Sequence, residues 1–123
     1  MPVGSWRKIK LGLPALGWAA LILLLSSIPG KELPHGPELP HLDKLVHVGL
    51  YAVLAFLLGR TGLRSAWVIL LSIAFGCLDE FYQSLTPGRS PDGMDILADA
   101  CGALLGAGFH VWLKGRGKEE SAS

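Results

Sequence analysis

The side chains in this sequence that could do chemistry are mainly carboxylates, grouped with a lysine and a histidine at the ends of apolar segments. Asp43, Lys44, His47 and Tyr51 open one apolar segment, Asp79, Glu80 and Gln83 close the next, and Asp92, Asp95 and Asp99 open the last. If successive segments run in opposite directions, all of these residues meet at one end of a bundle. Ionisable groups inside apolar segments are costly to bury, so they indicate a functional site.

Helical spacing would place these side chains on single faces, because residues three or four apart lie on the same side of a helix. The rows are Asp43, His47 and Tyr51; Ser72, Gly76, Glu80 and Gln83; and Asp95, Asp99, Gly102 and Gly106. The last row ends in the small-xxx-small pattern that lets two membrane helices approach closely. We expect the rows to face a shared polar pocket. Gly102 and Gly106 would pack against a helix of this chain or form a homodimer contact.

The predicted cluster holds more carboxylates than fixed cations, and this excess allows three kinds of site. Six carboxylates face only Lys44 and Arg89, with His47 able to add one proton. They cannot all stay ionised and unpaired in a partly desolvated place. A divalent cation, Ca²⁺ or Mg²⁺, could be held by carboxylate oxygens; the candidate ligands are Asp79, Glu80, Asp95 and Asp99. Alternatively, protonated acids with His47 and Tyr51 could relay protons, or Lys44 and Arg89 could hold an anionic headgroup.

The same residues also fit structural roles and a hydrolytic one. Asp43 and Asp92 could cap helices, and the whole cluster could serve as glue between helices. Hydrolysis with Asp79 or Glu80 as general base and His47 as acid is a further alternative. No nucleophile has a nearby base in the sequence, and no Walker loop, dinucleotide fingerprint, HExxH or GxSxG motif occurs. A zinc site would need more nitrogen or sulfur ligands than His47 supplies.

The elements that must position these residues are apolar helices. The chain has 123 residues, enough for one domain, and half of them are apolar while only 17% are charged. The mean hydropathy is +0.44, and a net charge of +1 offers no basic surface to nucleic acid. Four apolar segments run from Leu11 to Ile28, Leu45 to Gly59, Ser65 to Leu78 and Met94 to Leu113. The fold class predicted is all-α, an integral membrane four-helix bundle.

The bundle is predicted to span residues 11–113, between an N-terminal segment, 1–10, and a polar, frayed tail, 114–123. Pro14 would fall in the first turns of the first helix, where proline is tolerated. The second and third segments are short for a bilayer, so their helices should continue into the polar flanks. A cleaved signal peptide is an alternative for the first segment, although its apolar run is long and lacks a clear cleavage site.

Basic residues predict the orientation. They concentrate in the N-terminal segment, in the second connection and in the tail: Arg7, Lys8, Lys10, Arg60, Arg64, Lys114, Arg116 and Lys118. Because cytoplasmic loops carry the excess of lysine and arginine, both termini are expected in the cytoplasm and the polar cluster outside it. Trp6, Trp67 and Trp112 suit interfacial anchors, and Trp18 suits that role least.

Cys77 and Cys101 lie in apolar segments near the polar ends. A pair lining a redox or metal site is one interpretation. No CxxC motif is present, so we favour two small buried hydrophobic side chains.

Two blocks of the sequence resemble the signature of VanZ-like membrane proteins. The first is Asp43-Lys44-Leu45-Val46-His47-Val48-Gly49-Leu50-Tyr51, which matches a DKxxHxxxY pattern. The second, DEFYQSLTPGRSPDGMDILADACGALLG from Asp79 to Gly106, holds DExxQ, PGR, Asp95 and two glycines four residues apart. The resemblance extends from about Leu11 to Leu113. One position departs from it, since Asp99 stands where asparagine is usual, and the added acid would alter charge or metal preference.

The resemblance implies a small stand-alone, multi-pass protein of the bacterial cell membrane. The family takes its name from a protein associated with resistance to the glycopeptide teicoplanin, which is a phenotype rather than a mechanism. The leading hypothesis is a pocket that binds or moves an anionic envelope lipid or a lipid-linked cell-wall precursor. The ligand-binding candidates are Asp43, Lys44, His47, Tyr51, Gln83 and Arg89. A structural role, in which the polar cluster holds the helices together, ranks second. A metal-assisted hydrolase or transferase acting on lipid headgroups ranks third.

Overall fold

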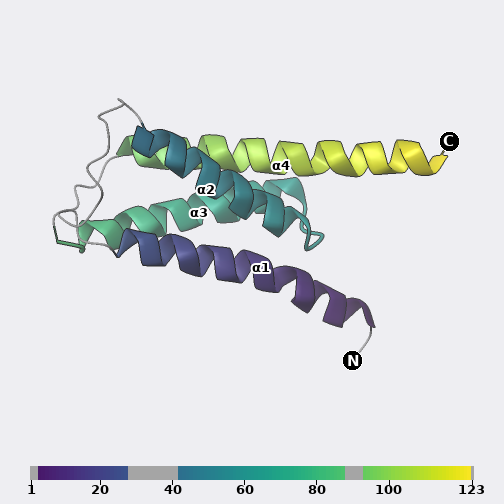
Figure 1. Cartoon of the computed structure of the whole chain (residues 1–123), viewed down its shortest axis with the longest axis horizontal. Helices are drawn as coiled ribbons and strands as arrows, with labels where there is room; N and C mark the ends of the chain where they lie inside the picture. Colours follow the sequence, from purple (N-terminus) through teal and green to yellow (C-terminus); the bar gives the residue numbers. More distant parts are fainter. Residues whose placement is uncertain (1–2, 28–41, 88–92, 123) are drawn as a thin grey trace.

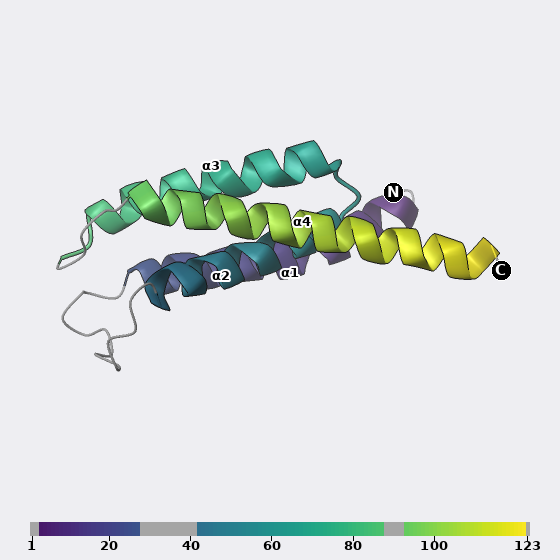
Figure 2. The same cartoon turned by 90° about the horizontal axis from the view of Figure 1, so that it is seen from above.

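The chain folds into four helices. A computed structural model describes residues 3–27, 42–87 and 93–122, and it contains α1 (Val3–Ser26), α2 (Leu42–Gly59), α3 (Ser65–Ser84) and α4 (Gly93–Ala122). No strand occurs among these described residues. α1 and α4 lie on opposite sides of the pair formed by α2 and α3 (Figure 1; Figure 2). The all-α four-helix prediction is confirmed.

The helices are longer than the apolar segments. As expected, α2 begins before Lys44 and α3 continues past Leu78 into the polar residues. Two expectations were wrong. α1 starts at Val3, so Pro14 lies inside that helix and not in its first turns. α4 continues to Ala122, so the backbone of the tail is helical through that residue and not frayed.

The outer surface of the bundle is apolar. Three helices are long and apolar enough to cross a membrane over Ile9–Ser26, Ser65–Ser84 and Gly93–Gly117, and the apolar part of α2, Lys44–Gly59, is shorter. Large side chains cover this surface, for example Leu16 at 68% exposed and Leu105 at 62%. A soluble monomer rarely exposes so much contiguous apolar surface. The chain is therefore a membrane protein.

The interior is built from small residues where α2 meets α4. Ala55, Ala103 and Ala107 are buried there together with Val68 of α3. Small side chains allow close backbone approach, which is the main source of packing energy between helices in lipid. A second apolar cluster of Ile22, Tyr51 and Leu54 joins α1 to α2.

Gly102 and Gly106 provide the closest approach of α4 to α2. A methyl group on Gly102 would overlap the carbonyl oxygen of Val48, and one on Gly106 would overlap that of Ala52. Both glycines are buried against α2 of the same chain. The glycine face, for which a homodimer contact was one alternative, is therefore occupied within the chain, since only glycine permits this backbone contact.

The direction of the four helices decides where the polar residues gather. α1 and α3 end, and α2 and α4 begin, at the end of the bundle opposite the two chain termini (Figure 1). The expected meeting of the polar rows at one end is confirmed. Trp18, the tryptophan that suited an interfacial anchor least, instead donates a hydrogen bond to the carbonyl of Leu50 at 2.8 Å and so links α1 to α2.

Candidate functional site

A buried polar layer connects all four helices at this end of the bundle. It consists of Ser26 from α1; Lys44, His47 and Tyr51 from α2; Asp79, Glu80 and Gln83 from α3; and Asp95 and Asp99 from α4. The least exposed members are Tyr51 at 0% and Asp79 and Asp99 at 1% each. Such groups are stable away from water only when their charges and hydrogen bonds are matched.

The first part of the layer is a row in which basic and acidic side chains alternate between α2 and α4. The ammonium of Lys44 donates to Oδ1 of Asp95 at 2.6 Å. Nε2 of His47 lies 3.8 Å from Oδ2 of Asp95, and its Nδ1 lies 2.8 Å from Oδ1 of Asp99. An ionised Asp99 would accept a hydrogen bond from Nδ1 of His47 across this contact. The row runs from a lysine side chain that is 22% exposed to an aspartate that is 1% exposed.

The second part of the layer is centred on Asp79 and joins α1, α2 and α3. Its carboxylate accepts hydrogen bonds from the hydroxyl of Ser26 and from the hydroxyl of Tyr51, the latter at 3.2 Å. The side-chain amide of Gln83 donates to Oδ2 of Asp79 at 3.4 Å and to the Ser26 hydroxyl at 3.2 Å. One carboxylate therefore collects donors from three helices, which specifies how those helices are rotated against one another.

The acids do not converge on a common point. Asp95 and Asp99 pair with Lys44 and His47, whereas Asp79 faces the donors from α1, α2 and α3. Over residues 3–27, 42–87 and 93–122, no three His, Cys, Asp or Glu side chains are placed to hold a metal ion. A Ca²⁺ site needs six to eight oxygen ligands. Within that described part, the candidates Asp79, Glu80, Asp95 and Asp99 do not form one ligand group, so the divalent-cation site and the metal-assisted enzyme stay predictions.

Direct side-chain contacts join members of the layer from all four helices. Two grooves of the structure lie elsewhere. One, of about 310 Å³, has apolar walls that include Ala15, Leu54 and Phe75. The other lies between the end of α2 and α4. Within the layer, Lys44 and His47 are the partly exposed members.

Two members of the site were not selected from the sequence. Ser26 was missed because α1 carries no charge in its apolar run, although a serine closing that run was a usable signal. Gly76 was placed on the α3 row without a role, and the structure supplies one. A Cβ at Gly76 would lie 2.8 Å from Oδ2 of Asp99, so the missing side chain makes room for that carboxylate.

Other predicted residues lie outside the layer or outside the described part of the chain. Arg89 and Asp92 fall in residues 88–92, which the structure does not describe. Asp43 lies within α2 and not before it, which does not fit a cap preceding the helix, and its side chain is not described. Cys77 and Cys101 are both exposed on the apolar surface, so the prediction that they are buried was wrong.

Gly76→Ala tests the space that α3 leaves for Asp99. The added methyl would also lie 3.1 Å from Cβ of Asp99, so the Asp99 side chain must shift. We expect a loss of about 1–3 kcal/mol, the usual effect of overpacking a filled interior. Thermal unfolding in detergent measures it. Gly49→Ala on α2 is the matched control, because no atom lies within 4 Å of its Cβ position; equal melting temperatures for the two variants would refute the role of Gly76.

A family model described as VanZ/LLP1 matches residues 5–114, a range that covers α1 from Ser5 onward and all of the polar layer. Because α1 lies inside the matched domain and contributes Ser26, it is part of the bundle. No curated protein and no solved structure gives a significant match.

Proposed function

The chain belongs to the VanZ/LLP1 family, and we propose that its polar end binds the anionic headgroup of an envelope lipid or of a lipid-linked cell-wall precursor. Lys44 carries this proposal. Its ammonium is held by Asp95 at 2.6 Å, yet the side chain keeps 22% exposure, more than the 14% of His47. A cation already ordered by the protein loses little further freedom when a phosphate arrives, which favours binding.

The remaining members of the layer would keep this cation in place. Asp99 orients His47 through the 2.8 Å contact, and His47 in turn approaches Asp95, the partner of Lys44. Arg89 follows α3 in the connection to α4, and its guanidinium would supply a second, bidentate phosphate contact. In this proposal the carboxylates would hold the two cations, Lys44 and Arg89, in position for the headgroup, and no metal ion is required.

The proposal also includes a side of the membrane. Both chain termini lie at the end of the bundle away from the polar layer (Figure 1), and the excess of basic residues near that end favours the cytoplasm for it. The polar layer would then face outward across a bacterial cell membrane. A fluorescent protein fused to the C-terminus should fluoresce, and alkaline phosphatase at the same position should stay inactive. An active phosphatase fusion would invert the topology and place the layer in the cytoplasm.

Lys44→Gln tests headgroup binding directly. Thermal unfolding in detergent is followed while a polyprenyl phosphate is titrated, and wild type is expected to show saturable stabilisation. The variant should bind at least about tenfold more weakly, because a hydrogen bond to a charged group contributes about 1.5–3 kcal/mol. Arg64→Gln is the control, since Arg64 is an exposed residue before α3 at the other end of the bundle. No stabilisation of wild type, or equal weakening by both variants, would end the proposal.

A cellular readout follows from the family's name. Expression of wild type in a glycopeptide-sensitive bacterium is proposed to raise tolerance to teicoplanin, and Lys44→Gln or Arg89→Gln at equal protein abundance should remove that effect. Loss of tolerance accompanied by loss of protein would instead indicate a failure to fold.

A second candidate function is structural, and the Asp79 network favours it. That carboxylate receives donors from three helices and is 1% exposed, so the layer also stabilises the bundle. Buried hydrogen bonds between membrane helices contribute only about 0.6 kcal/mol each on average. This is small compared with the free-energy cost of burying several ionisable groups. If every variant of the layer lost stability and none lost lipid binding separately, this second function would replace the first.

A further inference from the structure

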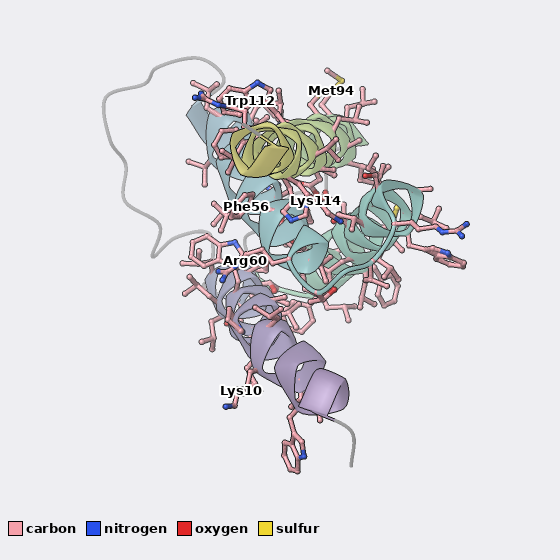
Figure 3. All side chains as sticks on the ribbon, turned by 90° about the vertical axis from the view of Figure 1, so that its right-hand side faces the viewer. Lys10, Phe56, Arg60, Met94, Trp112 and Lys114 are labelled. Carbon is pink, nitrogen blue, oxygen red and sulfur yellow. The ribbon has the colours of Figure 1, made fainter. Side chains whose placement is uncertain are left out.

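A groove of about 470 Å³ opens at the other end of the bundle, between the end of α2 and the part of α4 that runs past it. Arg60, His110 and Lys114 line it together with Phe56 and Leu113. Figure 3 looks onto this end, where Phe56, Arg60 and Lys114 lie near one another between the ends of the helices. None of these residues belongs to the polar layer, and the family match assigns them no role.

The local backbone gives the groove its shape. α2 stops at Gly59, and Gly62 takes a φ of 94°, which turns the chain toward α3 and which glycine adopts without strain. The ring of His110 packs over Gly59, where a Cβ would lie 2.9 Å from the ring. His110 also meets the ring of Phe56 edge to face at 5.7 Å. The groove thus has a fixed aromatic wall.

The charge of the groove is positive. Its lining contains two fixed cations, Arg60 and Lys114, and no carboxylate. Within the described part of the chain, neither cation forms an ion pair with an acid. Both side chains are exposed, so a ligand that enters the groove would meet them without breaking an existing pair.

We propose that this groove binds the phosphate of an anionic membrane lipid, with an acyl chain along Phe56 and Leu113. Basic pockets between membrane helices recognise phospholipid headgroups, and the lysine and arginine of such a pocket attract anionic lipid in preference to neutral lipid. The apolar wall beside the cations distinguishes a lipid from a soluble anion. Trp112 on the neighbouring turn of α4 is 53% exposed and stacks on Phe109, which suits the headgroup level of a membrane.

The test uses the full chain in detergent, with phosphatidylglycerol, phosphatidylcholine and inorganic phosphate each titrated separately. Thermal unfolding and native mass spectrometry measure binding. Wild type should bind phosphatidylglycerol and be unaffected by the other two. Arg60→Gln and Lys114→Gln should each weaken that binding about fivefold, and the double variant should lose it. Because both side chains are exposed, the lipid-free melting temperature should not change.

Arg64→Gln removes the same charge at the same end without touching the groove and should bind like wild type. The double variant should keep the stabilisation by polyprenyl phosphate that depends on Lys44, which separates this site from the proposed function. Equal weakening by Arg64→Gln would show a diffuse surface potential and overturn the site. Equal binding of phosphatidylcholine, or stabilisation by inorganic phosphate at the same concentration, would overturn its assignment to an anionic lipid.

Discussion

Gly106→Ala is expected to destabilise the bundle by about 3 kcal/mol, at the upper end of the range for overpacking. The added methyl would fall on the carbonyl oxygen of Ala52 and would lie 2.8 Å from its carbonyl carbon. The atoms in the way are backbone, so no side chain can rotate to relieve the overlap. α2 and α4 must separate, and the packing of Ala55 against Ala103 is lost with them. Thermal unfolding in detergent, followed by circular dichroism, measures the effect.

Gly108→Ala is the matched control on the same helix. No atom lies within 4 Å of its Cβ position, and alanine in a helix is favoured over glycine by about 0.5–1 kcal/mol. This variant should therefore melt at the same temperature as wild type or slightly higher. If both glycine variants behaved alike, the close approach of α2 and α4 at Gly106 would be refuted.

Asp79→Ala is expected to have an effect of similar size, a loss of about 2–4 kcal/mol. It removes the acceptor of hydrogen bonds from Ser26, Tyr51 and Gln83 and leaves those donors buried. A stranded buried donor costs about 1–3 kcal/mol in water-soluble proteins. In membranes a buried interhelical hydrogen bond averages only about 0.6 kcal/mol, because the separated helices find other partners. For three donors, the first figure gives a total of about 3–9 kcal/mol and the second about 1.8 kcal/mol. The expected loss lies between these totals.

Two further variants show whether the loss comes from the network. Asp79→Asn keeps the size of the side chain and one acceptor oxygen, so it should lose about half as much stability as alanine. Ser26→Ala combined with Asp79→Ala should lose less than the two single variants together, because residues that share a hydrogen bond are not additive. Ser84→Ala, an exposed change on the same helix, should be neutral. Strict additivity of Ser26 and Asp79 would contradict the contact between α1 and α3.

Much of the architecture could be predicted from the spacing of apolar and polar residues within each segment. Helical spacing placed Asp95 and Asp99 on one face of α4, and both are buried in the structure. The alternation of apolar segments predicted that the polar ends would meet, and they do. These features depend on helix geometry and on the chain reversing direction, both of which are encoded within a few residues of each position.

Which side chains of the site pair with one another depends on how each helix is rotated about its axis and shifted along it. The spacing of residues within one helix does not specify either. An excess of carboxylates predicted a shared pocket and a cation, whereas the structure divides the acids into two separate networks. Lys44 and His47 pair with the two acids of α4, and the donors to Asp79 include Ser26, which comes from a segment without charged residues.

Four apolar helices, and the end of the bundle at which their polar residues meet, could be predicted from the residues alone, because apolar length and helical period are properties of each segment. Tertiary packing specifies which carboxylate faces which donor. It also decided that Gly76 accommodates Asp99 and that Gly102 and Gly106 contact α2. Those contacts join residues distant in the chain, and they are fixed by the depth and rotation at which small side chains allow the helices to pack.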